Sequence, residues 1–411
     1  MASTINTNSI SLNAQRNLSG SQSSLATSMQ RLSSGLRVNS AKDDAAGLAI
    51  SERMNSQIKG NTVAARNSND GISLSQTAEG ALGKVGDMLQ RMRELAVQSS
   101  NATNSKDDRK ALQAEVSQLV DEIDRVAKQT SFNGTKILDG SFSGAVFQVG
   151  ANSGDNITVG ALTDSRATGL ADVVYAYSQS TGIDATSITD TGAITDASTL
   201  NINDGATTWN LGAIGAASSG TERLGQMVEA INRKSADTGV TAFLTRGGDG
   251  LYSIDLMSSK TDTDGNATTL TLSAGFTAGN FGVAGGAIGT IGDTQASLTA
   301  TDTTTDSLGI DTLSIDTQAN AWVALKKIDS ALDQVNNARA DLGALQSRFE
   351  NSVGSIEIQV ENLSASRGRI VDADFAQETA NLSRTQILQQ AGTAMVAQAN
   401  QLPQGVLALL Q

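Results

Sequence analysis

The stretch LKKIDSALDQVNNARADLGALQSRFENSVGSIEIQVENL, residues 325–363, decides the fold of most of this chain. Its apolar residues recur at alternating steps of three and four, which is the seam of a long α-helix packed against other helices. The seam positions are Leu325, Ile328, Leu332, Val335, Arg339, Leu342, Gln346, Phe349, Val353, Ile356, Val360 and Leu363. A seam of this length requires partner helices elsewhere in the chain.

The same spacing occurs three times on the N-terminal side. The three seams consist of Leu25, Met29, Leu32 and Leu36, then Leu82, Val85, Leu89, Met92 and Ala96, and finally Leu112, Val116, Leu119, Ile123 and Val126. We expect the second and third seams to pack on the C-terminal helix as an antiparallel bundle.

The pattern changes to short strands after Phe132. Asn133-Gly134 is a hairpin-turn signal, and strand candidates follow at residues 145–149 and 156–159. Further strand-like runs are Thr207–Leu211, Val240–Leu244, Tyr252–Leu256 and Thr268–Leu272, with one short helix at Glu222–Arg233. The sequence therefore predicts a mainly α fold, with N- and C-terminal helices forming a coiled-coil bundle around an inserted β-rich (α+β) middle domain.

Charge is concentrated in that middle. Residues 141–320 contain 19 acidic and six basic residues, a net charge of -13, which is also the net charge of the whole chain. An acidic middle suits a solvated surface. Because no basic stripe is present, nucleic acid is not expected as a partner.

Cysteine and histidine are both absent. Their absence excludes disulfides, thiol nucleophiles, Cys/His metal sites and Ser-His triads, so we expect no enzyme and no catalytic, cofactor or metal residues. Ser56 and Lys59 have the SxxK spacing of a Ser/Lys acylation centre. This spacing is common on amphipathic helices, so it does not indicate catalysis here. Asp262–Gly265 begins like a calcium loop but has its glycine at the wrong position. The acid pair Asp43-Asp44 could be considered for general acid/base catalysis, but the chain has no histidine to act as its partner.

Residues 31–50, RLSSGLRVNSAKDDAAGLAI, resemble the N-terminal signature of bacterial flagellins. The resemblance continues through LQRMRELAVQSSNATNS (residues 89–105), through residues 112–140 and through the C-terminal segment that begins at Ser347. The middle is where flagellins vary, and residues 199–272 resemble a small module inserted in many of them.

The resemblance implies a structural subunit of the flagellar filament, exported by the flagellar type III apparatus without a cleaved signal peptide and polymerised outside the cell. It implies filament-core helices in residues 1–45 and 372–411, a helical bundle with a β-hairpin in 46–165 and 311–371, and a variable outer domain in 166–310. The implied partners are further copies of the chain, an export chaperone on the C-terminal helix, and hook-associated and cap proteins.

Two sets of site residues follow from the resemblance. The polymerisation seams include Leu25, Leu32, Leu36, Leu388, Met395 and Leu402. The second set, Arg91, Leu95 and Glu115, resembles the patch by which the vertebrate innate receptor for flagellin detects released monomers. Arg91 and Leu95 are four residues apart and are expected to share a helix face, which Glu115 approaches from the next helix. An ion pair with no receptor role would fit the same spacing.

Both ends of the chain lack charged residues, over 1–15 and 385–411. They can therefore enter a crowded filament core without burying unpaired ions. The C-terminal stretch is too rich in Gln and Asn for a membrane span. Burial of its large aliphatic side chains would contribute roughly 14–27 kcal/mol, against roughly 27–54 kcal/mol of backbone entropy. We expect it to be disordered in the monomer and helical after assembly.

Two alternatives remain at this point. One is a flagellar hook-filament junction protein with similar termini. The other is a secreted enzyme or adhesin carried by the same helices, although the chain cannot form the HExxH zinc motif of protease-bearing flagellins because it has no histidine. The dense match at residues 31–50 favours the filament subunit.

Overall fold

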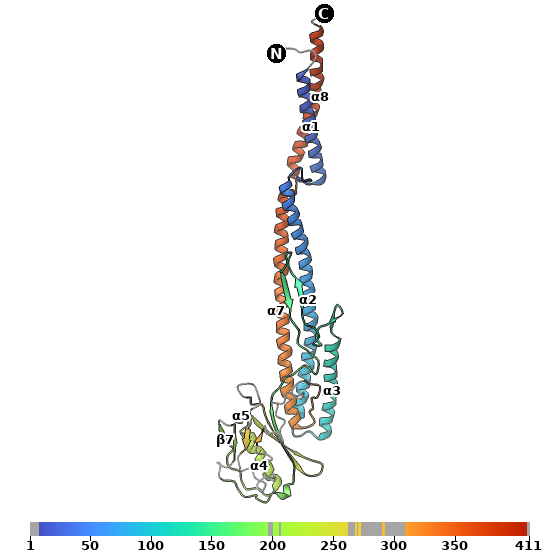
Figure 1. Ribbon diagram of the computed structural model, residues 1–411. Coiled ribbons are helices and arrows are strands. Elements are labelled where there is room, and N and C mark those ends of the chain that lie inside the picture. Colours follow the sequence, from blue (N-terminus) through green and yellow to red (C-terminus); the bar gives the residue numbers. More distant parts are fainter. Residues whose placement is uncertain are drawn as a thin grey trace. The chain divides into compact units, whose positions relative to one another are not determined.

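The computed structural model combines long helices with a smaller β-containing region (Figure 1). It describes residues 8–195, 200–204, 207–261, 268, 270–272, 290–291 and 309–408. Contacts divide the chain into a first unit, residues 1–72, 146–158 and 347–411, and a second unit, residues 73–145 and 159–346. The predicted fold class, mainly α with a β insert, is confirmed. The three-part domain division stays a prediction.

The helices are α1 (Ser9–Ser34), α2 (Ala45–Ser99), α3 (Lys106–Gln129), α4 (Gly220–Arg233), α5 (Ser235–Thr238), α7 (Gln318–Val371) and α8 (Phe375–Ala408), with a 3₁₀ turn at Ala185–Ser187. The strands are β1 (Ser131–Phe132), β2 (Thr135–Lys136), β3 (Ala145–Gln148), β4 (Asn156–Val159), β5 (Ala176–Ile183), β6 (Asn201–Asn203), β7 (Thr208–Asn210), β8 (Val240–Arg246), β9 (Tyr252–Ser258), β10 (Leu270–Leu272) and β11 (Thr290–Ile291).

In the first unit, α1 and α8 lie side by side and antiparallel (Figure 1). The Asn8 side chain caps α1 by accepting from Ser11 N, and its amide donates to the Ala399 carbonyl at 2.7 Å. At the other end of the pair, Arg31 Nη1 donates to Glu378 Oε1 at 3.1 Å.

The signature stretch forms the junction that follows α1. Gly35 ends the helix at φ +73°, a left-handed conformation that favours glycine. Arg37 N then donates to the Val371 carbonyl at 2.6 Å, and Leu36 forms an isolated bridge with Asp372. The break between α1 and α2 is therefore hydrogen-bonded to the break between α7 and α8.

A close helix approach and a β-hairpin complete the first unit. The Phe349 ring on α7 lies so near α2 that a Cβ at Gly71 would be 2.6 Å from it. Phe147 on β3 packs edge-on against that ring, with centroids 5.5 Å apart. The Asn67 amide on α2 donates to the Gln148 carbonyl at 3.0 Å, which fixes the predicted β3–β4 hairpin on the helices.

In the second unit, α2, α3 and α7 form the predicted antiparallel bundle. On α2 and α7, Arg93 pairs with Asp329 at 2.7 Å and Glu79 with Gln346 at 2.8 Å, so the two helices run in opposite directions. The predicted α2 seam is fully buried, at Leu82, Val85, Leu89, Met92 and Ala96.

The buried face of α3 contains two residues of the predicted seam, Val116 and Ile123, and departs from it at the other positions. Its buried residues are Val116, Val120, Ile123 and Ala127. Leu112, Leu119 and Val126 are only half-buried. A helix on the outside of a bundle buries a single stripe, and the small residue Ala127 lies in that stripe while the larger Val126 lies beside it.

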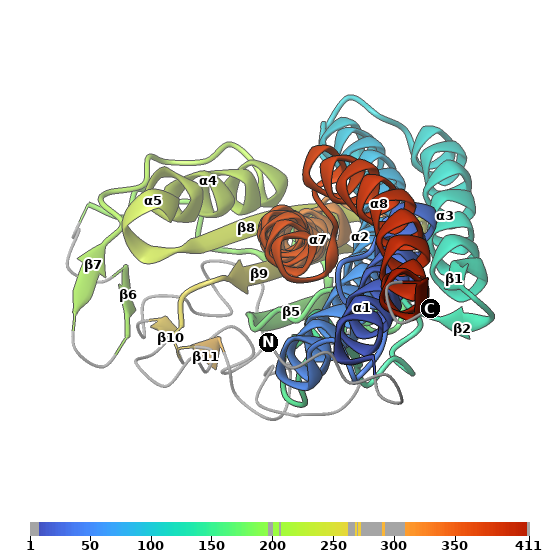
Figure 2. The same cartoon turned by 90° about the horizontal axis from the view of Figure 1, so that it is seen from above.

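The β-rich insert belongs to the second unit. A three-stranded sheet has the order β5-β9-β8, and α4 packs against it over a common apolar core (Figure 2). A second sheet has the order β11-β10-β6-β7. The Asn133-Gly134 turn joins β1 to β2 with positive φ at both residues, as predicted. Strands β5, β6 and β11 were not predicted.

Candidate functional site

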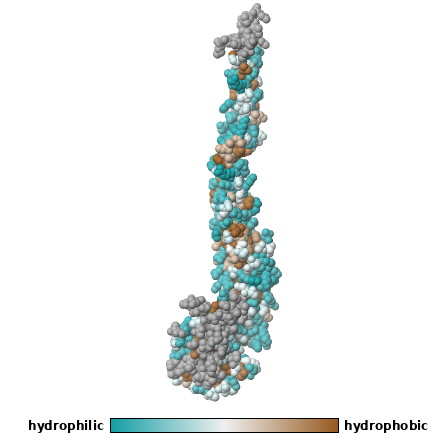
Figure 3. Space-filling view, in the orientation of Figure 1, coloured by the Kyte–Doolittle hydropathy of each residue, from teal (hydrophilic) through white to brown (hydrophobic). Residues whose placement is uncertain are grey.

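The α1–α8 pair buries few side chains fully, half-buries Leu18, Leu25, Leu32 and Leu382, and leaves several large apolar side chains exposed. In α1, only Ser11 and Ser28 are buried. In α8, Glu378 and Thr385 are buried, and Ala399 is the buried apolar residue among those described. The large exposed apolar side chains of the pair are Ile10, Leu12, Met29, Phe375, Ile387, Leu388 and Met395, at 49–65% exposure. Figure 3 shows hydrophobic patches on the otherwise hydrophilic face of this pair.

The predicted polymerisation residues differ in where they lie and how far they are exposed. Leu25 and Leu32 are half-buried on α1, whereas Leu388 and Met395 are exposed on α8. Leu36 lies beyond the end of α1, in the bridge to Asp372. The side chain of Leu402 lies outside the described part of the chain. The helix α8 has the conformation expected after assembly, and disorder of the free tail stays a prediction.

A partly buried ion pair between Arg31 and Glu378 joins the last turn of α1 to the first turn of α8. Glu378 is nearly buried, and its Oε2 and the Arg31 Nε have no hydrogen-bond partner among the described residues. Asp43 lies in the junction that follows α1, where hydrogen bonds from Ser40 hold the pKa of its carboxyl below the usual range. The positive charge of Arg31 lowers that pKa further.

Arg91 and Glu115 meet as predicted, on the surface between α2 and α3. Their side chains are 2.8 Å apart, and Glu94 is 3.0 Å from the same guanidinium. The hydrogen bond from Arg91 to Glu115 is the main cause that raises the pKa of Arg91. Leu95 does not share this surface, because it is only 1% exposed and lies in the bundle core. Positions four apart are offset by about 40° around a helix, enough to separate a rim residue from a core residue.

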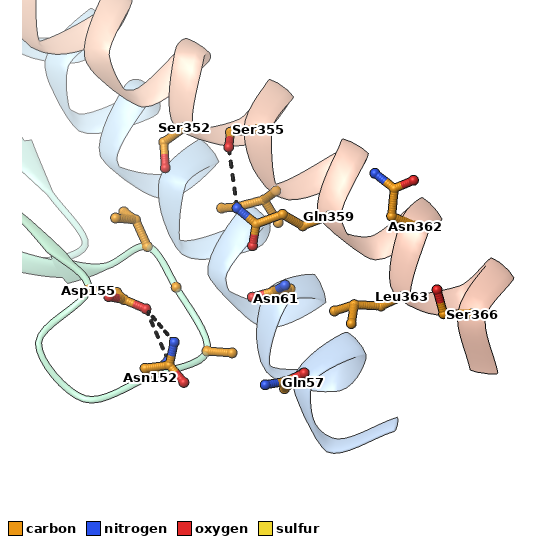
Figure 4. A pocket seen from close by; sticks show the side chains of 14 residues that line it. Gln57, Asn61, Asn152, Asp155, Ser352, Ser355, Gln359, Asn362, Leu363 and Ser366 are labelled. Atoms are coloured by element: carbon orange, nitrogen blue, oxygen red, sulfur yellow. Dashed lines mark hydrogen bonds between the residues drawn. The ribbon is translucent and has the colours of Figure 1, made fainter. Parts of the chain in front are cut away.

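A polar groove in the first unit was not predicted from the sequence. It has a volume of about 620 Å³ and lies between α2, α7 and the loop at the tip of the β3–β4 hairpin (Figure 4). Gln57 and Asn61 line it from α2, and Ser352, Gln359 and Leu363 from α7. The hairpin loop reaches α2 at Gly60, where an added Cβ would lie 3.0 Å from the Ala151 Cβ.

Asn61 could have been found by extending the α2 seam backward. The same steps of three and four lead from Leu82 through the buried residues Ala78, Ser75, Gly71, Ser68 and Ala64 to Asn61. These residues are small or polar, so a search for large apolar side chains passes over them.

Within the described ranges, no group of three or more acidic side chains could hold a metal ion. Within the same ranges, no helix is both long and apolar enough to cross a membrane.

Both ends of the chain match known sequence families. The bacterial flagellin N-terminal helical region matches residues 5–143, and the C-terminal helical region matches residues 325–410. The chain is 39% identical to flagellin A of Vibrio cholerae serotype O1 and 38% identical to a flagellin of Salmonella rubislaw, with all of both chains covered in each comparison. A solved structure of flagellar hook associated protein-3 from Legionella pneumophila is 15% identical and covers 78% of this chain and 98% of its own, with a TM-score of 0.39.

Proposed function

The chain belongs to the bacterial flagellin family and is an extracellular structural subunit of the flagellar filament, and on this premise we propose that it polymerises through α1 and α8. The observation that carries the proposal is the apolar surface of this helix pair, on which seven large apolar side chains are 49–65% exposed. Such a pair leaves apolar area in water unless neighbouring subunits cover it.

Substitutions on the outer face of α8 test this proposal. Ile387→Asn and Met395→Asn should slow elongation from filament seeds, because both side chains are more than 60% exposed and contribute little inside the monomer. Gln386→Asn, on the same helix and also exposed, is the matched control. The proposal fails if the first two variants elongate at the rate of the control.

We further propose that the same apolar face is covered before assembly by an export chaperone bound to the C-terminal helix. Export then follows the flagellar type III route without cleavage of a signal peptide. Hook-associated and cap proteins meet the two ends of the filament through the terminal helices. Pull-down of the chain with the cognate chaperone, with and without residues 385–411, tests the first of these partners.

We also propose that the released monomer is recognised by the vertebrate innate receptor for flagellin at Arg91 and Glu115. The support is the exposed, hydrogen-bonded pair that these residues form on the outside of the bundle. Arg91→Ala should raise the half-maximal dose in a receptor-reporter titration. Arg125→Ala, which removes an equally exposed arginine paired with Glu122, should leave the dose unchanged.

The hook-filament junction protein is the less favoured alternative. Flagellins match the chain at 38–39% identity over its entire length, which supports the filament subunit. Flagellins are structural proteins rather than enzymes, in keeping with the expectation from the missing cysteine and histidine.

A further inference from the structure

The methionines of this chain differ sharply in exposure, and the exposed ones lie on the α1–α8 pair. Met29 on α1 is 56% exposed, and Met395 on α8 is 63% exposed. The other described methionines are buried or half-buried, and they are Met54, Met88, Met92, Met227 and Met257. Met1 lies outside the described residues. An oxidant in solution therefore reaches the thioethers of the helix pair before those of the bundle and the insert.

The thioether is the group on this chain that a peroxide attacks most readily, because cysteine is absent. A sulfur lone pair attacks one oxygen of hydrogen peroxide, and the S–O bond forms as the O–O bond breaks. The proton of the attacked oxygen passes to the departing hydroxide, which leaves as water. The sulfur is oxidised to a sulfoxide and the peroxide is reduced. A polar hydrogen-bond acceptor then replaces a flexible apolar group.

Both methionines belong to the apolar surface on which the proposed polymerisation depends. Met29 is four residues after Leu25 and three before Leu32, so it lies on the same side of α1 as these half-buried leucines, yet it stays exposed. Met395 is seven residues after Leu388, which is 49% exposed and lies on the same side of α8. Oxidation at either position places a polar group within this apolar surface.

We propose that Met29 and Met395 are oxidation sites through which peroxides stop a free subunit from joining the filament. The inference rests on the proposed polymerisation through α1 and α8. In the monomer the sulfoxide oxygen is hydrated, so folding is unaffected. Docking onto a neighbour would carry that oxygen out of water into apolar surroundings, which disfavours assembly. A subunit already in the filament has both thioethers covered and is protected.

Peroxide treatment of the monomer, followed by peptide mass spectrometry, tests the selectivity. Both thioethers should be oxidised about tenfold faster than the core methionines, which are Met92, Met227 and Met257, at 0–2% exposure. The melting temperature of the oxidised monomer should be nearly unchanged, because both sites are on the surface. The critical concentration for seeded elongation should increase about tenfold or more, equivalent to about 1.4 kcal/mol.

The double variant Met29→Leu/Met395→Leu separates these two sites from every other oxidisable group. Leucine keeps the volume and the apolar character and has no thioether, so this variant should extend seeds equally well before and after peroxide treatment. Met88→Leu is the matched control, because Met88 is half-buried on α2 and both proposed sites remain. Peroxide should inhibit the control as it inhibits the unmodified chain. Equal inhibition of the double variant would overturn the proposal.

Assembled filaments provide an independent test of protection. In filaments treated with peroxide, Met29 and Met395 should be oxidised more slowly than in the monomer, and equal rates would contradict the proposal. Methionine sulfoxide reductases with a dithiol should restore elongation of the oxidised monomer, because the sulfoxide oxygen leaves as water while the dithiol becomes a disulfide. Inhibition that persists after the sulfoxides are reduced would also contradict it.

Failure of this inference and failure of the proposed function give different results. If Ile387→Asn elongates like its control, polymerisation does not use this face, and the proposed function itself is wrong. If Ile387→Asn is slowed while monomer oxidised at both sites elongates normally, only the oxidation proposal is overturned.

Discussion

At the scale of residues, Leu95 and Arg91 are close in sequence but have different roles. Leu95 is in the bundle core, so Leu95→Ala should lower the free energy of unfolding by about 2–5 kcal/mol. Arg91→Ala removes an exposed ion pair and should change it little. Urea unfolding of both variants checks this, and equal destabilisation would contradict the placement of Leu95. Any loss of receptor activation by Leu95→Ala should accordingly come from unfolding.

Exposed carboxyls determine the response of the monomer to pH. Hydrogen bonds from Ser40, Ser105 and Ser218 lower the pKa values of Asp43, Asp108 and Glu222 respectively. A pKa that is lower in the folded state contributes stability above the unfolded value, and this contribution is lost as the pH falls through the folded value. The urea midpoint should therefore decrease below about pH 4.5.

Between pH 5 and 8 the same midpoint should be flat, because the chain has no histidine to titrate there. Urea unfolding at half-unit intervals from pH 2.5 to 8 provides the measurement. A transition near pH 6.5 would point to a buried carboxyl with a raised pKa, which is at odds with the groups described.

Spacing alone could place Arg91 against Glu115 but could not place Leu95. Two residues four apart on a helix are offset by about 40° around its axis. Which of the two is buried depends on where the neighbouring helices pack. Asn61 was missed for a related reason. A polar residue at a seam position is visible only after the seam itself has been traced through small side chains.

At the scale of elements, the approach of α2 to α7 depends on one glycine. Alanine normally stabilises a helix by about 1 kcal/mol relative to glycine. Gly71→Ala should instead destabilise the chain, since its Cβ would lie 2.6 Å from the buried Phe349 ring. Gly80→Ala is the control, because nothing lies within 4 Å of its Cβ position, and it should raise the melting temperature. A stabilising Gly71→Ala would show that the helices are farther apart.

Long helices and the hairpins could be predicted because their signals are local. Heptad spacing predicted α2 and α7, and the Asn-Gly pair predicted the β1–β2 turn. Strand β5 has no such signal, since its sequence AYSQSTGI mixes small and polar residues on both faces. It is held by antiparallel pairing with β9 and by the hydrogen bond from the Tyr177 hydroxyl to Asp255, both of which depend on distant sequence.

At the scale of the whole molecule, the acidic middle should be dispensable for polymerisation. The residues that flank it meet, because Ile310 N donates to the Ala167 carbonyl at 2.6 Å. Replacing residues 168–306 by a short linker should therefore leave the helices in place and filament formation intact. Negative-stain microscopy after seeding tests this. Failure to polymerise, with normal helicity in the circular dichroism spectrum, would contradict it.

The central claim is that the terminal helices drive assembly, and seeded elongation of the full chain beside a chain ending at Arg384 tests it most directly. The full chain should extend seeds into long filaments. The shortened chain should not, although its melting temperature should be nearly unchanged because Ile387, Leu388 and Met395, which it loses, are exposed on α8. Elongation by the shortened chain, or none by the full chain, would contradict the account.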